Sequence, residues 1–272
     1  LFSPSILPFS NVVKKINQIN PDIVHLHWIC GGMIKIEDLS KIVAPIVWSL
    51  HDNWAFTGGC HIKLECNKYK DSCGSCPRLK SKNINDLSRR TWKRKMKTFS
   101  SIDNLNIIGL SRWLNRCSLE SSLLKDKKHF QLPNPINTKL FKRLDKIKAR
   151  ELWNIPQNKK IILCGSLNIN DKFKGFAELI ASIDKISTED VEIVVFGSSN
   201  PIKALDLKIK AHYVGKLSDE ISMATLYSLA DLTLVPSLSE NLSNVIMESL
   251  SCETPVVGFD VGGNSDLIEH KK

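Results

Sequence analysis

The sequence predicts an α/β protein with parallel sheets. Short apolar segments rich in valine, isoleucine and leucine alternate with segments of helical periodicity, which is the pattern of strand–helix units. A hydrophobic fraction of 42% and a charged fraction of 24% are ordinary for a globular chain, and 272 residues suffice for one large or two smaller domains. No apolar run approaches the ~20 residues that cross a bilayer.

The expected strands are short runs of β-branched and other apolar residues, and the expected helices repeat apolar residues at intervals of three and four. Strands are predicted at Ile23–Leu26, Ile46–Leu50, Asn106–Leu110, Ile161–Cys164, Val191–Phe196, Leu232–Val235 and Val256–Phe259. Helical periodicity is clearest at Phe176–Ile186 and Asp219–Ala230. Alternation within Ile23–Leu26 leads us to expect that either His25 or His27 is a core histidine.

The strand–helix series is interrupted near residue 137. Gln131–Asn137 contains two prolines, which break a regular pattern, and the charged segment Lys139–Arg150 follows. A new strand–helix series begins after this segment. The simplest interpretation is two α/β domains, at residues 1–137 and 138–272.

Two glutamates near the end of the sequence predict a ligand site. Glu240 follows the predicted strand Leu232–Val235 and its closing Pro236, and Glu248 lies in the next predicted helix. Ligands of open α/β sheets bind beyond the carboxyl ends of the strands. Ser243 is a candidate N-cap for the helix, whose free N–H groups would face an anion. Two carboxylates around such donors suggest a site for a sugar nucleotide.

A net charge of +10 favours polyanionic partners, namely nucleic acid, phospholipid headgroups or phosphate-bearing substrates. Many cations fall in one segment, opposed only by Asp86: Arg78, Lys80, Lys82, Arg89, Arg90, Lys93, Arg94, Lys95 and Lys97. Trp92, Met96 and Phe99 lie near helical spacing among them. A basic amphipathic helix is typical of membrane-surface elements, and an ordinary solvated helix face is the alternative.

Four cysteines lie in one polar loop, with His61 next to the first: Cys60, Cys66, Cys73 and Cys76. Four soft ligands in a loop suit a tetrahedral structural zinc ion, although the spacing is less regular than in zinc ribbons. Disulfides are the alternative, which a cytosolic setting disfavours. The remaining cysteines lie in or beside apolar segments and are expected in the core: Cys30, Cys117, Cys164 and Cys252.

The segment from Ser237 to Gly263 resembles the nucleotide-sugar site of the retaining glycosyltransferases of family 4, whose GT-B fold has two Rossmann-like domains facing across a cleft. Three further segments resemble the same family in order along the chain: Asn20–His27, Ser111–Trp113 and Leu132–Phe141. The loop from His51 to Cys60 is similar to that of a subset acting in surface polysaccharide synthesis. By this resemblance we expect both domains to be incomplete, the first lacking its opening strands and the second its last elements.

The resemblance implies roles for particular residues of the donor site. Glu248 would accept hydrogen bonds from the ribose hydroxyls, and Glu240 would hold the transferred sugar. Lys174 would neutralise the leaving diphosphate. The family's arginine is replaced by Ser166, so Lys172 would act as a second cation. The remaining donor-binding positions would be Gly165, Leu242, Ser243 and Asn244.

In the first domain, His51 matches the family's active-site histidine and would contact the transferred sugar. The resemblance implies a glycosyltransferase that moves a sugar from a nucleotide diphosphate to a glycan acceptor, lipid-linked, with retention and without a catalytic cofactor. The expected location is cytoplasmic and peripheral on the inner face of the plasma membrane, with no nucleic acid partner. The alternatives are a nucleic-acid-binding zinc module, or a sugar-nucleotide epimerase or phosphorylase on the same fold.

Overall fold

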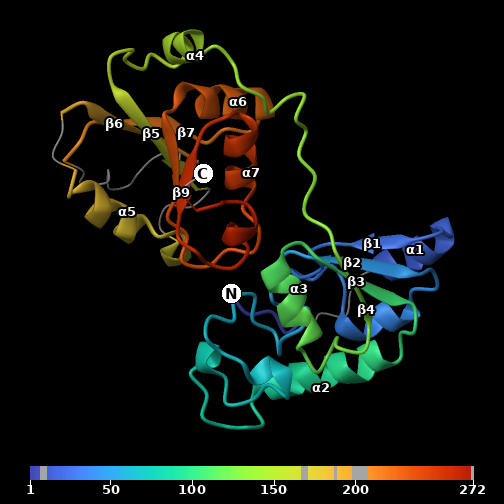
Figure 1. Ribbon diagram of the computed structural model, residues 1–272. Helices are drawn as coiled ribbons and strands as arrows, with labels where there is room; N and C mark the ends of the chain where they lie inside the picture. Colours follow the sequence, from blue (N-terminus) through green and yellow to red (C-terminus); the bar gives the residue numbers. More distant parts are fainter. Residues whose placement is uncertain (7–10, 167–170, 187–188, 198–207, 271–272) are drawn as a thin grey trace. The chain divides into compact units, whose positions relative to one another are not determined.

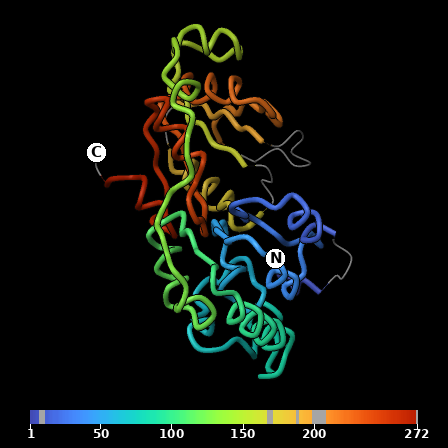
Figure 2. Tube along the Cα trace, turned by 90° about the vertical axis from the view of Figure 1, so that its right-hand side faces the viewer, coloured from blue at the N-terminus to red at the C-terminus, as the bar shows by residue number. Residues whose placement is uncertain are grey.

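The computed structural model describes residues 1–6, 11–166, 171–186, 189–197 and 208–270 (Figure 1). The chain divides into two compact units, Leu1–Pro133 and Asn134–Lys272. It passes from one to the other through residues 132–137, which contain no helix or strand (Figure 2). Each unit contains a sheet whose neighbouring strands are all parallel, so the predicted α/β class is confirmed.

The first unit is built on a four-stranded sheet in the order β1-β2-β3-β4. Its strands are β1 (Val24–Leu26), β2 (Ile46–Leu50), β3 (Leu105–Gly109) and β4 (Lys128–Gln131). Its helices are α1 (Val12–Ile19), α2 (Leu87–Ser100) and α3 (Arg112–Leu119), with 3-10 turns at Ile36–Lys41, Lys68–Lys70 and Pro77–Leu79. One hydrophobic cluster joins the sheet to α2 and α3, with Ile107, Phe99 and Leu114 fully buried.

The second unit is built on a five-stranded sheet in the order β7-β6-β5-β8-β9. Its strands are β5 (Lys160–Gly165), β6 (Val191–Phe196), β7 (Ala211–Gly215), β8 (Leu232–Val235) and β9 (Val256–Gly258). Its helices are α4 (Lys146–Leu152), α5 (Phe176–Ile183), α6 (Glu220–Leu229) and α7 (Asn244–Ser251), with 3-10 turns at Lys172–Lys174 and Asn264–Asp266.

Alternation along β5 and β6 directs side chains to helices on both faces of this sheet. Ile162 and Cys164 face the cluster that contains Leu179 of α5. Ile161 and Leu163 face the opposite cluster, which includes residues of α4 and α6. Figure 1 shows α5 and α6 on opposite sides of the sheet. Strands buried on both faces are therefore almost wholly apolar, which explains why β5 and β6 were predicted.

The strand order places a switch point between β5 and β8. From β5 the chain builds outward through β6 and β7, and it then returns to the other side of β5 to form β8 and β9. The connections that leave the carboxyl ends of β5 and β8 therefore diverge and open a crevice between them. This crevice is where a ligand site is expected in such a sheet.

Candidate functional site

A pocket opens at the carboxyl ends of β5, β6 and β8. Each of these strands ends at it, with Gly165, Phe196 and Val235 in its wall. The other lining residues come from the connecting loops and from α6 and α7: Ser166, Lys174, Gly197, Leu217, Met223, Pro236, Ser237, Glu240, Leu242, Ser243, Asn244, Val245 and Glu248. The structure thus brings together every donor-site residue expected from the sequence except Lys172.

The two lysines of the 3-10 turn after β5 have different surroundings. Lys174 lines the pocket, and its Nζ donates to Glu240 Oε2 at 3.0 Å. Lys172 is exposed, with its Nζ 5.3 Å from the centre of the Phe173 ring, and it is not among the lining residues described. Lys174 is therefore a cation of the pocket, and Lys172 is a cation of the surface.

Two glycines allow the pocket loops to approach one another closely. A Cβ on Gly175 would lie 1.7 Å from the carbonyl oxygen of Pro236, and a Cβ on Gly262 would lie 1.6 Å from that of Glu240. Both have a positive φ, of 69° and 59°. Because only glycine fits such contacts, these positions fix the backbone that carries Lys174 and Glu240.

A side chain of α6 holds the Glu248 carboxylate in place. The Tyr227 hydroxyl donates to Glu248 Oε2 at 2.7 Å, and the Tyr227 side chain is fully buried. Burial raises the pKa of Glu248, and the bond from Tyr227 opposes that shift. Burial, with the carboxylate next to it, raises the pKa of Tyr227, so its hydroxyl remains a donor. This bond occupies one carboxylate oxygen.

The start of α7 completes the pocket wall. Ser243 occupies the N-cap position, as predicted, but its side chain makes no capping hydrogen bond. The first N–H groups of a helix have no partner within the helix and can bind an anion. Ser243 and Asn244 both line the pocket, so an anionic ligand could reach this helix end.

In the first unit, three histidines gather at the carboxyl ends of β1 and β2. His27 Nδ1 lies 2.8 Å from His51 Nε2, and the rings of His25 and His27 are 4.3 Å apart. The expectation of one core histidine in β1 was wrong: His25 and His27 are two residues apart, point to the same face and are both exposed. Burial and the neighbouring His27 lower the pKa of His51.

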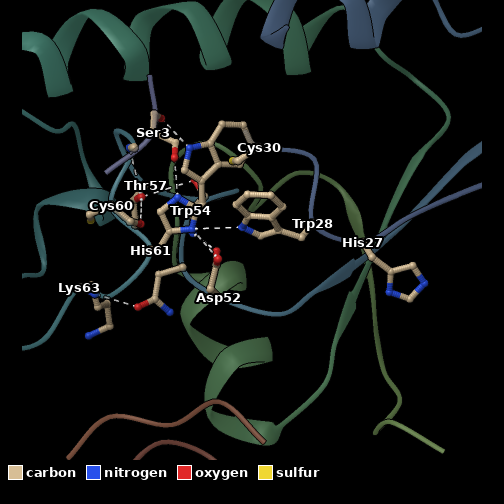
Figure 3. Close-up of polar contacts among 12 residues, drawn as sticks. Ser3, His27, Trp28, Cys30, Asp52, Trp54, Thr57, Cys60, His61 and Lys63 are labelled. Carbon is tan, nitrogen blue, oxygen red and sulfur yellow. Dashed lines mark hydrogen bonds and ion pairs between the residues drawn. The ribbon is translucent and has the colours of Figure 1, made fainter. Parts of the chain in front are cut away.

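The segment after His51 is tied by a chain of polar contacts (Figure 3). Asp52 Oδ2 lies 2.6 Å from His61 Nδ1, and His61 Nε2 lies 2.8 Å from Ser3 Oγ. Asp52 also accepts from the backbone N–H of Trp54 at 2.7 Å. His61 is almost completely buried, so these contacts join the first residues of the chain to the loop.

The part of the basic segment from Arg89 to Lys97 lies in α2, and the apolar side chains of this helix pack inward. Phe99 is buried, and Trp92 and Met96 pack against the core of the first unit. Lys95 is completely buried, with its Nζ donating to the Trp54 and Thr57 carbonyls, and burial lowers its pKa to about 7. The apolar side of the helix therefore belongs to the core, and a membrane-surface role for its cations stays a prediction. The cations left exposed here are Lys80, Lys82, Arg90, Lys93 and Lys97.

The cysteines of the polar loop surround one small cavity. Cys60, Cys66, Cys73 and Cys76 line it, and the Gly58 N–H lies 3.0 Å from Cys73 Sγ as a donor. All eight cysteines are free thiols. Among the residues described, no three His, Cys, Asp or Glu side chains stand in the arrangement of a metal site. The other four cysteines are buried, as expected: Cys30, Cys117, Cys164 and Cys252.

The chain is similar to known glycosyltransferases in sequence and in structure. Residues 158–272 match the family described as Glycosyl transferases group 1. An uncharacterized glycosyltransferase of Methanocaldococcus jannaschii is 24% identical over 276 residues, which cover 92% of this chain and 68% of that protein. The N-acetyl-alpha-D-glucosaminyl L-malate synthase of Bacillus anthracis is 23% identical over 186 residues, or 62% of this chain. The chain spans only 48% of that relative's length.

Solved structures agree on the fold. Sucrose-phosphate synthase from Thermosynechococcus elongatus superposes with a TM-score of 0.65 at 20% identity, covering 92% of this chain and 59% of that chain. HepE of Anabaena, in complex with UDP-glucose, gives a TM-score of 0.64 at 17% identity, covering 95% of this chain and 66% of that chain. The fold is therefore of the GT-B type, and its second unit carries a glycosyl transferases group 1 domain. Within the described residues, no helix has the length and apolar character needed to cross a membrane.

Proposed function

We propose, from the glycosyl transferases group 1 domain at residues 158–272, that this protein transfers a sugar from a nucleotide diphosphate to a glycan acceptor with retention of configuration. The pocket at the ends of β5, β6 and β8 carries the proposal. It places a lysine–glutamate pair, a second carboxylate and a helix start around one space. A nucleotide sugar has a diphosphate, a sugar and a ribose that such groups can bind.

Each group has a proposed partner in the donor. Glu248 would accept from the ribose hydroxyls through the oxygen that Tyr227 leaves open. Lys174 and the first turn of α7 would bind the diphosphate, and Glu240 would hold the transferred sugar. Lys174 donates to Glu240, so this cation lies inside the pocket. His51 of the first unit stays the proposed further contact of the transferred sugar.

The proposed reaction needs no protein nucleophile. The bond from the anomeric carbon to the leaving phosphate oxygen breaks, the bond to the acceptor oxygen forms on the same face, and the acceptor's proton passes to the departing phosphate. Negative charge develops on that phosphate, where a fixed cation stabilises the transition state most. Lys174 and the start of α7 supply this stabilisation, so the step requires no cofactor.

We also propose the kind of donor, the acceptor and the location of the protein. HepE of Anabaena was solved with UDP-glucose, which supports a nucleotide-sugar donor. The acceptor is proposed to be a lipid-linked glycan of surface polysaccharide synthesis, in the cytoplasm and at the inner face of the plasma membrane. Because the apolar side of α2 is packed, membrane attraction would be electrostatic, through Arg90, Lys93 and Lys97. Equal flotation with anionic and neutral vesicles would contradict it.

The decisive experiment measures nucleotide release from a donor panel of UDP-glucose, UDP-N-acetylglucosamine and GDP-mannose, with and without glycoside acceptors. We expect acceptor-dependent release of one nucleotide diphosphate and a product that keeps the donor's anomeric configuration by NMR. Glu248→Gln should lose most of this activity, whereas Glu151→Gln, an exposed glutamate on α4, should keep it. Conversion of the donor sugar without nucleotide release would indicate an epimerase, and dependence on inorganic phosphate would indicate a phosphorylase.

A further inference from the structure

We propose that Trp28 and the histidines next to it form a subsite in the first unit that binds the pyranose ring of the acceptor glycan. This inference deepens the proposed function and rests on it. Trp28 is the second residue after β1, at the edge of the sheet where β1 and β2 end. A small recess there is lined by His27, Trp28, His51 and Asp52, together with apolar residues.

Trp28 is far more exposed than the other tryptophans beside it. Its side chain is 48% exposed, whereas Trp48 and Trp54, which line the same cavity, are 2% exposed. Burial of an indole is strongly favourable, so a half-exposed one beside a cavity leaves apolar area for a ligand. The C–H face of a pyranose is an apolar surface of matching size.

The indole is held in a defined orientation. A Cβ on Gly31 would lie only 3.2 Å from the Trp28 ring, so the glycine backbone packs against the ring edge. Gly31 also has a φ of 68°, which favours glycine. The His61 ring lies 6.0 Å away at 38°, and Figure 3 shows Trp28 beside His61 and Asp52. A platform fixed in this way loses little entropy when a sugar binds.

The indole N–H of Trp28 makes one long contact, with the His61 ring. The indole nitrogen lies 3.5 Å from His61 Nδ1, but that His61 nitrogen also lies 2.6 Å from Asp52 Oδ2. A carboxylate only accepts, so the proton between them sits on Nδ1, which then cannot accept from Trp28. The indole N–H therefore has a long, poorly matched contact and would gain a true hydrogen bond from a sugar oxygen.

The polar groups around the ring favour a neutral sugar over a phosphate. His27 and His51 are exposed at the cavity, with His27 Nδ1 2.8 Å from His51 Nε2, and the other His27 nitrogen, Nε2, can donate to or accept from a sugar hydroxyl, depending on the tautomer. No lysine or arginine lines this cavity, among the residues described. An exposed aromatic face with polar groups at its edge suits a sugar ring, which has an apolar face and hydroxyls at its rim.

The test uses ligand-observed saturation-transfer NMR on the purified protein with octyl β-D-glucoside and octyl α-D-mannoside, and with UMP to detect base stacking instead. We expect transfer to ring protons of at least one glycoside, an affinity at least about fivefold weaker in Trp28→Ala, and an intermediate value in Trp28→Phe. Met33→Ala is the matched control, because Met33 has the same 48% exposure in the same loop but does not line the cavity.

Equal glycoside binding by Trp28→Ala and the wild type would overturn the subsite, and so would binding of UMP alone at Trp28. Hydrolysis of UDP-glucose without acceptor is measured in parallel on the same samples. Glycoside binding that depends on Trp28, with no turnover of any donor, would support the sugar subsite and sink the proposed transferase. Donor turnover with no effect of Trp28→Ala on acceptor binding or acceptor KM would support the proposed transferase and overturn the sugar subsite.

Discussion

The Tyr227 hydroxyl donates to Glu248 Oε2 at 2.7 Å, from a side chain of α6 that is fully buried. The bond therefore joins the hydrophobic core of the second unit to a carboxylate that lines the pocket. It holds one Glu248 oxygen in place and leaves the other for a ligand. Tyr227 is a positioning residue, since it does not itself line the pocket among the residues described.

Replacing Tyr227 by phenylalanine should weaken donor binding without slowing the chemical step. A hydrogen bond to a charged group contributes about 1.5–3 kcal/mol, so roughly 10- to 150-fold is the upper limit of the affinity lost when Glu248 is no longer held in place. We expect the donor KM to rise within that range while kcat changes little. Tyr69→Phe is the control, because Tyr69 also contacts a glutamate, Glu120, but in the first unit. A loss of thermal stability alone, with donor KM unchanged, would show that Tyr227 acts only in packing.

The raised pKa of Glu248 predicts two effects of pH with a defined sign. Its ordinary value is 4.5, and burial raises it, so in the window above pH 4.5 the folded protein binds a proton that the unfolded chain has lost. Stability contributed by this group is therefore highest at low pH and falls as pH rises through the window. Thermal unfolding of wild type and Glu248→Gln from pH 4 to 8 should show the wild type losing relative stability with rising pH.

Donor binding should change in the opposite direction. In the proposed donor complex the Glu248 carboxylate accepts the ribose hydroxyls, so acidification through the same window should weaken donor binding in the wild type. Glu248→Gln should bind weakly at every pH. A donor affinity in the wild type that is flat between pH 4.5 and 7 would contradict the ribose assignment, even if both proteins unfold as expected.

The two lysines of the 3-10 turn should differ sharply on substitution. Lys174→Ala removes the cation of the pocket and leaves Glu240 without its ion-pair partner, whereas Lys172→Ala removes a cation at the surface. Loss of one charge-stabilising group costs about 10²–10³ in rate. We expect such a fall in kcat/KM for Lys174→Ala and a change of less than about threefold for Lys172→Ala. Comparable losses in both variants would mean that Lys172 reaches the diphosphate as well.

The sequence predicted the buried strands well because their composition is dictated by burial on both faces. The predicted bounds of Ile46–Leu50, Val191–Phe196 and Leu232–Val235 are those observed. The strand β4 was missed since Lys128–Gln131 is polar and mostly exposed at the sheet edge. The strand β7 was missed for a related reason, as each of its residues is only half-buried.

Site residues that follow a strand could be predicted from the sequence. A residue that acts from one helix on a side chain of another could not. Glu240 lies in the loop beyond the end of β8, so its position indicated it, whereas Lys174, in the 3-10 turn after β5, was indicated by the family resemblance. Tyr227 lies 21 residues before Glu248, within an apolar stretch of α6 that has the pattern of a core helix. Its hydroxyl is directed to the pocket by tertiary packing, for which local sequence carries no signal.

A structural zinc ion in the cysteine loop remains a prediction. The four thiols line one cavity, and the completely buried Lys95 lies beside the same loop, where thiolates on a metal would balance its charge. The thiols are not already arranged as a metal site, so binding would have to draw them together. Elemental analysis should find about one zinc per reduced chain, lost in Cys73→Ser but kept in Cys164→Ser. Zinc well below one equivalent in the wild type would contradict the prediction.

The approach of Gly262 to Glu240 can be tested apart from the preference of glycine for positive φ. Gly262→Ala would place a Cβ 1.6 Å from the Glu240 carbonyl oxygen, at a φ of 59°. Gly215→Ala is the control, because Gly215 has a φ of 74° but no atom within 4 Å of an added Cβ. The control should therefore show only the backbone cost of alanine at positive φ, about 1 kcal/mol.

Gly262→Ala must also displace the loop that carries Glu240, which opens the ion pair with Lys174. We expect it to lower the free energy of unfolding by about 1–3 kcal/mol more than the control, as measured by urea unfolding of both variants. Donor turnover should fall as well in Gly262→Ala and remain near the wild-type level in Gly215→Ala. Equal destabilisation in the two variants would mean that the Glu240 loop moves away from the added Cβ at no measurable cost in stability. Gly262 would then be required for its positive φ alone.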